Sequence, residues 1–168
     1  MSKYQFIKFE VRDKEIGIIS VNRPKKMNAV SFETLSEIEQ CILNDVQPYS
    51  SGLRVLILAA EGKHFTSGID MQSAAQISQV GQDIDQGEPD VARISVKISD
   101  LVLRLQRYTS SLEVCRVPVI CAIQGYCIGA GIDMSSACDI RLCSKDAKFT
   151  IKEVDIGICA DLGTIQRF

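Results

Sequence analysis

The chain has 168 residues, 46% of them hydrophobic and 24% charged, a composition typical of a globular protein and unlike that of a disordered or fibrous one. Nineteen basic and 21 acidic side chains give a net charge of -2, which provides no global field for a polyanion and argues against nucleic-acid binding. This length fits one domain, burying roughly two thirds of its unfolded surface. We therefore expect a single domain over residues 1–168.

The seven cysteines form no C-x-x-C pair, and most lie in apolar segments, where cysteine behaves as a small hydrophobic residue. With His64 as the only histidine and no zinc-type cysteine spacing, the sequence predicts no metal site. No stretch reaches the roughly twenty apolar residues of a membrane helix, and no signal peptide is visible. We expect a soluble protein in a reducing, intracellular compartment.

The start of the chain predicts a hairpin followed by a helix. The β-branched-rich runs 6–11 and 16–21 flank the polar segment 12–15, a pattern typical of two antiparallel strands and their turn. Ser31 is a suitable helix N-cap, and the apolar residues after it recur at helical spacing. We therefore expect an amphipathic helix over residues 32–47.

The middle of the chain predicts a buried strand, a short helix and a loop. Residues 53–60 are almost continuously apolar, as expected for a strand buried on both faces of a parallel sheet. A short helix is expected after Asp70. The glycine, acidic residues and proline of segment 81–90 predict an exposed and mobile loop.

The rest of the chain alternates between helix and strand patterns, which favours α/β layers. Apolar residues at helical spacing predict a second amphipathic helix over 94–112. A strongly apolar strand is expected over 117–123 and a helix of small residues over 129–137. Two further short strands are expected at 139–143 and 149–151.

Two turns that contain glycine each join a strand to the start of a helix, at residues 65–70 and 125–133. Backbone N–H groups at a helix start carry partial positive charge, so two converging turns could hold a polarised carbonyl oxygen in an oxyanion hole. The alternative is that the glycines only permit tight turns. Dinucleotide binding fits less well, because Met134 occupies the third glycine position of G-x-G-x-x-G and no G-K-[ST] phosphate loop occurs.

Three acidic residues, Asp133, Glu153 and Asp161, lie in unusually apolar parts of the sequence. Apolar surroundings favour the protonated form of a carboxyl group, which suits a general acid or base that exchanges protons with carbon. For Glu153 and Asp161, helix capping or a surface position are alternatives that the sequence alone leaves open.

Four ordered segments resemble signatures of the crotonase (enoyl-CoA hydratase/isomerase) superfamily, and the resemblance covers essentially the whole chain. They are N-R-P-K-K-M-N-A at 22–29, F-T-S-G-I-D at 65–70, G-Y-C-I-G-A-G at 125–131 and A-C-D-I-R at 137–141. The resemblance implies an α/β fold with the crotonase-type ββα spiral core, an acyl-CoA-binding core from which the family's C-terminal helical region is missing. It also implies a homotrimer or homohexamer.

The branch of the family is indicated by the segments 149–157 and 160–167, which are similar to those of dienoyl-CoA isomerases. These enzymes carry acids at the positions of Asp133, Glu153 and Asp161, whereas hydratases usually have a glutamate at the first and another residue at the last. The resemblance implies isomerisation of 3,5-dienoyl-CoA to 2,4-dienoyl-CoA in fatty-acid β-oxidation. The alternatives are an enoyl-CoA hydratase, a delta(3)-delta(2)-enoyl-CoA isomerase, or a catalytically silent binding module of the same fold.

By the same resemblance, the backbone N–H groups of Ile69 and Ala130 would form the oxyanion hole. Ala130 stands where glycine is often found, which a backbone donor tolerates if the local angles suit a residue with a Cβ. Glu153 would act at the carbon next to the carbonyl and Asp161 at the far end of the diene. Asp133 would orient its neighbours or tune their proton affinity.

The resemblance also implies how the substrate is held. Coenzyme A is expected as part of the substrate, with no metal, flavin or nicotinamide cofactor, because the electrons stay within the substrate. Similar enzymes occur in mitochondria and peroxisomes, so either organelle is expected. Alternatively, Lys25 and Lys26 are exposed lysines on a loop without a role in binding. The expected substrate-binding residues are Lys25, Lys26, Ala29, Gly68, Asp70 and Gly129.

Overall fold

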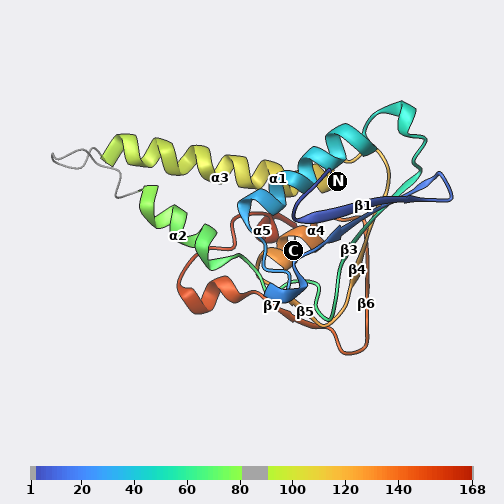
Figure 1. Cartoon of the computed structure of the whole chain (residues 1–168). Helices are drawn as coiled ribbons and strands as arrows, with labels where there is room; N and C mark the ends of the chain where they lie inside the picture. The colour runs from blue at the N-terminus through green and yellow to red at the C-terminus, as the bar shows by residue number, and fades with distance from the viewer. Residues whose placement is uncertain (1–2, 81–90, 168) are drawn as a thin grey trace.

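The fold is described from a computed structural model for residues 3–80 and 91–167 (Figure 1). Segment 81–90, for which an exposed loop is expected, lies outside the described residues. Within the described ranges, no helix is long and apolar enough to cross a membrane.

The described residues form a five-stranded sheet with the order β1-β2-β3-β4-β6. Strand β1 pairs with β2 in an antiparallel hairpin, and the other neighbours are parallel. Asp13 and Lys14 in the hairpin turn both have positive φ, the conformation that matches the twist of two paired strands. The predicted hairpin and the predicted parallel strands are confirmed. The bounds are Ile7–Arg12 for β1, Ile16–Val21 for β2, Val55–Ala60 for β3, Val119–Ile123 for β4 and Ile140–Cys143 for β6.

A second sheet contains two short parallel strands, β5 (Tyr126–Ile128) and β7 (Lys148–Thr150). Strand β7 lies one residue before the position predicted for it. Strand β5 was not predicted, because three residues between Gly125 and Gly129 are too few to show an alternating pattern. This small sheet places the second glycine turn next to the end of β7.

Helix α1 (Phe32–Cys41) begins at the predicted cap, where the Ser31 hydroxyl accepts the N–H of Thr34. The expectation of one α-helix to residue 47 is wrong, because Ile42–Val46 form a π-helical turn. The wider turn keeps Ile42 and Val46 both fully buried. The other helices are α2 (Met71–Val80), α3 (Val91–Glu113), α4 (Ala130–Ser136) and α5 (Thr164–Arg167).

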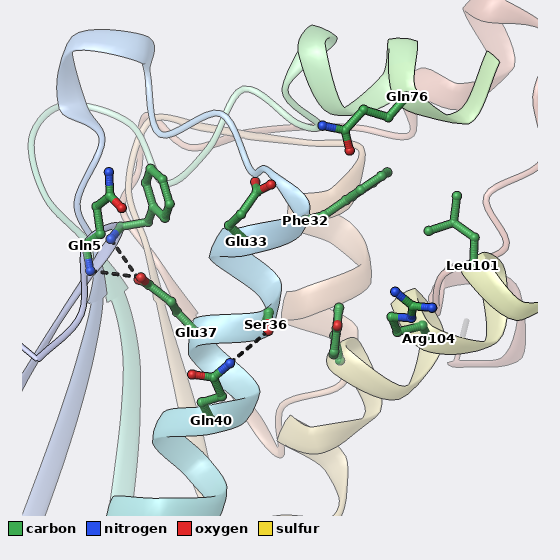
Figure 2. Close-up of a pocket in the computed structure, with 11 residues that line it drawn as sticks. Gln5, Phe32, Glu33, Ser36, Glu37, Gln40, Gln76, Leu101 and Arg104 are labelled. Carbon is green, nitrogen blue, oxygen red and sulfur yellow. Dashed lines mark hydrogen bonds between the residues drawn. The ribbon is translucent and has the colours of Figure 1, made fainter. Parts of the chain in front are cut away.

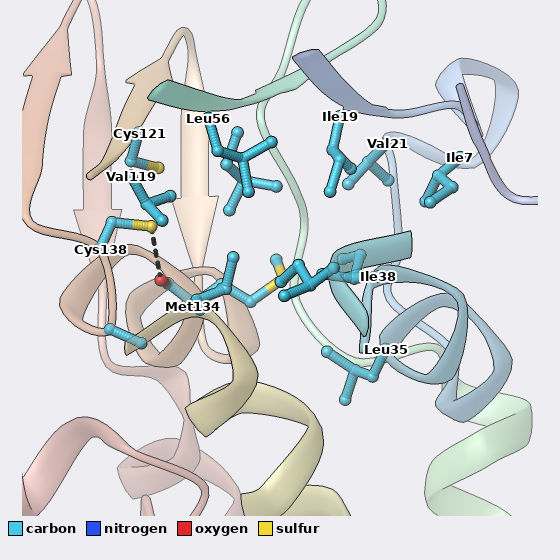
Figure 3. Packing of buried hydrophobic residues seen from close by; sticks show 14 of the residues in the cluster. Ile7, Ile19, Val21, Leu35, Ile38, Leu56, Val119, Cys121, Met134 and Cys138 are labelled. Atoms are coloured by element: carbon cyan, nitrogen blue, oxygen red, sulfur yellow. Dashed lines mark hydrogen bonds between the residues drawn. The ribbon is translucent and has the colours of Figure 1, made fainter. Parts of the chain in front are cut away.

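Helices α2 and α3 extend together away from the sheet, whereas α4 and α5 lie close to it (Figure 1). Side chains of the sheet, of α1 and of α4 meet in one apolar core (Figure 3). The core places the N-terminus of α4 beside the loops that follow the parallel strands. Its largest members with less than 2% exposure include Ile19, Leu35, Ile38, Leu56 and Met134.

The expectation that β3 is buried on both faces is wrong for the described residues. Leu56 and Leu58 are fully buried, but Ile57 between them is only partly buried. On β6, Ile140 and Leu142 are 48% and 59% exposed. One face of the sheet is thus packed on the core. The apolar side chains on the other face of β3 and on β6 are only partly covered by the described residues.

Candidate active site

The segment 65–70 crosses from the small sheet to the loop that follows β2. At its start, Thr66 forms a parallel bridge with β5: its N–H donates to the Tyr126 carbonyl at 2.9 Å, and its carbonyl accepts the Ile128 N–H at 3.2 Å. Gly68 has a φ of +98°, and a Cβ on it would lie 3.2 Å from the Ile128 carbonyl oxygen. The two glycine turns predicted from the sequence are therefore in direct contact.

Further along the same segment, the backbone pairs with Val30. The Val30 N–H donates to the Gly68 carbonyl at 2.8 Å, and the Asp70 N–H donates to the Val30 carbonyl at 2.7 Å. Because the N–H groups of successive residues in an extended chain point in opposite directions, this bridge turns the Ile69 N–H away from Val30. Among the described residues, the Ile69 N–H donates to no protein acceptor.

The Ala130 N–H is the second donor that the sequence suggested. Gly129 has a φ of +51° and donates its own N–H to the Thr150 carbonyl at 2.9 Å, so the chain turns sharply into α4. Ala130 is then the first residue of the helix, where N–H groups lack an intrahelical partner. A Cβ on Gly131 would lie 2.4 Å from Cγ2 of Thr66, so this turn of α4 packs directly on the segment that carries Ile69.

The loop after β2 owes its shape to Asn28, which is 1% exposed. Its side-chain N–H groups donate to the carbonyls of Glu61 and His64, both at 2.7 Å, and its Oδ1 accepts the Arg23 N–H at 2.9 Å. Met27 and Asn28 both adopt positive φ. The role of Asn28 was not predicted from the sequence. Asparagine tolerates the left-handed conformation better than most residues, which is a sequence signal for a turn of this kind.

Lys25 and Lys26, both predicted to bind substrate, are exposed on this loop. They belong to the short 3-10 helix Pro24–Lys26. Lys26 Nζ lies 3.8 Å from Oδ2 of Asp70. The Ala29 carbonyl, in contrast, is occupied, because it accepts a hydrogen bond from the Arg23 guanidinium.

Asp70 forms an ion pair with Arg23 in which Nη2 and Oδ2 are 2.6 Å apart and the side chains are 12% and 8% exposed. Its Oδ1 accepts the Gln72 N–H at 2.9 Å at the start of α2. The pKa of Asp70 is lowered, first by this backbone hydrogen bond and then by Arg23. The role of Arg23 was not predicted, because a separation of 47 residues gives no local signal of its contact with Asp70.

Glu153 lies on the 3-10 helix Lys152–Ile156, and its carboxyl group reaches the start of α4. A Cβ on Gly129 would lie 3.0 Å from Oε1 of Glu153. The Oε2 atom is buried and has no hydrogen-bond partner among the described residues. Burial is the main cause that raises the pKa of Glu153, and the negative charges of Asp133 and Asp161 raise it further.

Asp133 is 2% exposed and binds the beginning of α5. Its Oδ1 accepts the backbone N–H of Thr164 at 2.8 Å and the Thr164 hydroxyl at 2.7 Å. Burial raises the pKa of Asp133, although the bonds from Thr164 act in the opposite direction. Helix α5 is thereby fixed to α4 shortly after Asp161.

Asp161 is exposed, and its backbone carbonyl accepts the side-chain N–H of Gln106 on α3 at 2.8 Å. Its negative charge contributes to the raised pKa of both Asp133 and Glu153. The charges of Asp133 and Asp161 thus both act on the Glu153 carboxyl group. Among the described residues, no group of three or more His, Cys, Asp or Glu side chains is arranged to hold a metal ion.

A separate pocket of about 570 Å³ opens between α1, α2, α3 and the start of β1 (Figure 2). None of the residues predicted for the site contributes to its lining. Glu37 in its wall accepts the N–H groups of Gln5, Phe6 and Ile7 and so anchors β1. The lining residues are Gln5, Phe6, Phe32, Glu33, Ser36, Glu37, Gln40, Gln76, Leu101, Arg104 and Tyr108.

The sequence profile of the enoyl-CoA hydratase/isomerase family matches residues 12–168. The chain is 42% identical over 165 residues to the mitochondrial Delta(3,5)-Delta(2,4)-dienoyl-CoA isomerase of Rattus norvegicus, covering 98% of this chain and 48% of the relative. It is 43% identical over 157 residues to the peroxisomal Delta(3,5)-Delta(2,4)-dienoyl-CoA isomerase of Arabidopsis thaliana, covering 92% and 54%. The chain thus spans about half the length of the curated relatives it matches.

Solved structures show the same architecture. An enoyl-CoA hydratase from Shewanella pealeana superposes with a TM-score of 0.79 at 21% identity, covering 95% of this chain and 54% of that one, a likeness that shows the fold alone. A Thermobifida fusca protein provisionally assigned as an enoyl-CoA hydratase, solved in complex with acetoacetyl-CoA, gives a TM-score of 0.77 at 25% identity, with 96% and 60% coverage. The crotonase-type α/β fold is confirmed, and the chain belongs to the enoyl-CoA hydratase/isomerase family.

Proposed function

We propose that this chain carries the acyl-CoA-binding core of an enzyme that converts 3,5-dienoyl-CoA to 2,4-dienoyl-CoA in fatty-acid β-oxidation. The names of the relatives that are about 40% identical support this activity. The observation that carries the proposal is the buried, unpaired Oε2 atom of Glu153 beside Gly129. A carboxyl group in this position, with a raised pKa and a free oxygen, suits proton exchange with carbon.

In this mechanism the thioester oxygen accepts the N–H groups of Ile69 and Ala130, which stabilise the negative charge that develops on it. Glu153 removes a proton from C2, the carbon next to the carbonyl. The C2–H electrons form the C2=C3 double bond, the C3=C4 pair shifts to C4=C5, and the C5=C6 pair takes at C6 a proton that the exposed Asp161 relays from solvent. One proton leaves and one enters, so no oxidant or reductant is needed.

Asp133 contributes without touching the substrate. Its bonds to Thr164 fix the segment that follows Asp161, and its charge raises the pKa of Glu153. A carboxylate whose pKa is raised is a stronger base once it is ionised. This division of roles assigns one acid to each end of the diene and gives the third the tasks of fixing α5 and raising the pKa of Glu153.

The substrate class follows from the family. We propose that coenzyme A enters as part of the substrate, which is supported by the acetoacetyl-CoA complex of the Thermobifida fusca relative. We also propose that it lies near Lys25 and Lys26, which are exposed on the loop after β2. The reaction requires no metal, flavin or nicotinamide. A mitochondrial or peroxisomal location is proposed from the names of the relatives.

A homotrimer or homohexamer is also proposed. Apolar side chains of β6, β7 and the following 3-10 helix are exposed in the single chain, and contact with another copy would cover them. They include Ile140, Leu142, Phe149 and Val154.

The test compares Glu153→Gln and Asp161→Asn with the wild-type protein on a 3,5-dienoyl-CoA substrate, following the conjugated product by ultraviolet absorbance. Each substitution should lower kcat about a hundredfold or more, while the affinity for CoA thioesters changes little, because proton transfer belongs to the chemical step. The matched control is Asp155→Asn, an exposed acid on the same 3-10 helix that pairs with Lys152. Its kcat should stay at the wild-type value.

Two results would overturn the proposal. One is an Asp161→Asn protein with wild-type isomerase activity. The other is a wild-type protein that hydrates 2-enoyl-CoA but does not isomerise the diene, which would replace the isomerase assignment by a hydratase.

A further inference from the structure

The Asp70 carboxylate is fully engaged inside the protein. One oxygen binds the Arg23 guanidinium at 2.6 Å, and the other caps α2 by accepting the Gln72 N–H at 2.9 Å. The side chain is only 8% exposed. A carboxylate with both oxygens occupied and almost no accessible surface has little capacity left to bind a ligand, in contrast to the substrate-binding role expected from the sequence.

Arg23, the partner of Asp70, lies on the loop after β2. Its backbone N–H is fixed by Asn28, and its guanidinium lies 5.3 Å from the centre of the Phe6 ring. The guanidinium donates to the Ala29 carbonyl and to Asp70 at once. It therefore ties the residue before Val30 to the residue after Ile69.

Val30 and Ile69 are the two residues of the backbone bridge that turns the Ile69 N–H away from Val30. The ion pair thus clamps this bridge from one side, with Arg23 on the loop that carries Lys25 and Lys26. A small rotation of the peptide between Gly68 and Ile69 would change the direction of the donor. Catalytic donors lose effect steeply with such displacements.

We propose that Arg23 and Asp70 are positioning residues for the oxyanion hole: their ion pair fixes the orientation of the Ile69 N–H and connects it to the loop at the CoA side of the site. The inference rests on the proposed function, since it assigns a task to a donor of the proposed hole. A purely structural ion pair would stabilise the fold without affecting how the thioester carbonyl is bound.

The experiment measures dissociation constants of CoA and of acetoacetyl-CoA by calorimetry for the wild type and for Asp70→Asn, Arg23→Gln and Arg23→Lys. CoA lacks the thioester carbonyl, so the ratio of the two constants reports the oxyanion hole separately from the rest of the site. Asparagine keeps the capping acceptor and removes the charge, so Asp70→Asn should still fold. Glu39→Gln is the matched control, because the Glu39–Arg107 ion pair joins α1 to α3 and touches neither loop.

We expect the wild type to prefer acetoacetyl-CoA. Asp70→Asn and Arg23→Gln should reduce this preference about tenfold, the value of one charge-assisted hydrogen bond, with the CoA constant changed less than about twofold. Arg23→Lys should recover part of the preference, and Glu39→Gln should keep all of it. On the dienoyl substrate the same two variants should lower kcat/KM about tenfold, because its thioester carbonyl uses the same donors.

The inference is overturned if the wild type shows the preference and Asp70→Asn and Arg23→Gln keep it, whatever their melting temperatures. A wild type without any preference for the thioester would instead remove the proposed oxyanion hole, and the inference with it. If Arg23→Gln does not fold, Asp70→Asn and Arg23→Lys decide the question.

Discussion

Two sides of the candidate site differ in whether their buried polar side chains are hydrogen-bonded. The loop side, formed by residues 22–30, 65–70 and 125–131, satisfies its buried polar side chains, as the three hydrogen bonds of Asn28 show. The acid side, formed by residues 152–164, leaves Oε2 of Glu153 buried without a partner. An unpaired buried polar atom costs stability. The loop side therefore has its geometry fixed by hydrogen bonds, whereas the acid side keeps one carboxylate oxygen unpaired, as the proposed proton transfer requires.

The largest expected effect is a loss of stability from a substitution on the loop side. Gly125 has a φ of +58°, and a Cβ there would lie 2.4 Å from the Lys63 carbonyl oxygen and 2.5 Å from Nδ1 of His64. Because backbone cannot move aside cheaply, Gly125→Ala should lower the free energy of unfolding by about 3 kcal/mol. The control on the acid side is Gly157→Ala, with a φ of +71° and no atom within 4 Å of the added Cβ.

Gly157→Ala should cost only the backbone strain, about 1 kcal/mol. Urea unfolding of both variants measures the difference. Equal losses of stability would show that close packing does not distinguish the two sides.

An intermediate loss of stability is expected from a substitution at Thr164, which donates hydrogen bonds to Asp133 on the acid side. Thr164→Val removes the hydroxyl that donates to Asp133 at 2.7 Å and retains the shape of the side chain and the backbone hydrogen bond. The loss should be about 1.5 kcal/mol, because a buried carboxylate loses one donor. A thermal unfolding curve identical to that of the wild type would mean that this bond contributes nothing to holding α5 on α4.

The smallest effect is a difference in pH dependence between the two sides. The pKa of Asp70 is lowered from 3.8, so its contribution to stability is present above that pH and is lost as the pH falls through the folded-state pKa. The pKa of Glu153 is raised from 4.5, so stability falls as the pH rises from about 4.5 through the folded-state pKa. The two carboxyl groups therefore contribute slopes at different pH and of opposite sign.

Urea unfolding at a series of pH values tests this difference. Asp70→Asn should destabilise the protein at neutral pH, and the deficit should shrink in acid. Glu153→Gln should gain relative to the wild type as the pH rises above 4.5. Parallel curves for the two variants would contradict the assigned environments.

Local sequence patterns predicted the parts of the fold that depend on neighbouring residues. The hairpin follows from two β-branched runs around a polar turn, and the start of α1 follows from the capping hydroxyl of Ser31. Strand β5 and the π-helical turn at Ile42–Val46 were missed, because each depends on what packs against it.

The site was harder to predict for the same reason. Asp133 and Glu153 have similarly apolar sequence surroundings, yet Asp133 is paired with Thr164, 31 residues away, and one oxygen of Glu153 is left unpaired. The pairing of Arg23 with Asp70 is a tertiary contact without a local signal. Sequence patterns therefore located the acids but could not assign their different environments.

The donors proposed at Ile69 and Ala130 belong to the backbone, so side-chain mutagenesis does not remove them. An alanine scan keeps every N–H in place, and position 130 is already alanine, so such a scan would report both positions as unimportant. In such a scan, losses of activity would instead be found at Arg23, Asp70 and the glycines that shape the turns. Replacing a single amide by an ester at either position, through chemical synthesis, removes the donor without altering any side chain. For this fold, replacing a backbone amide tests the proposed donors more directly than replacing a side chain.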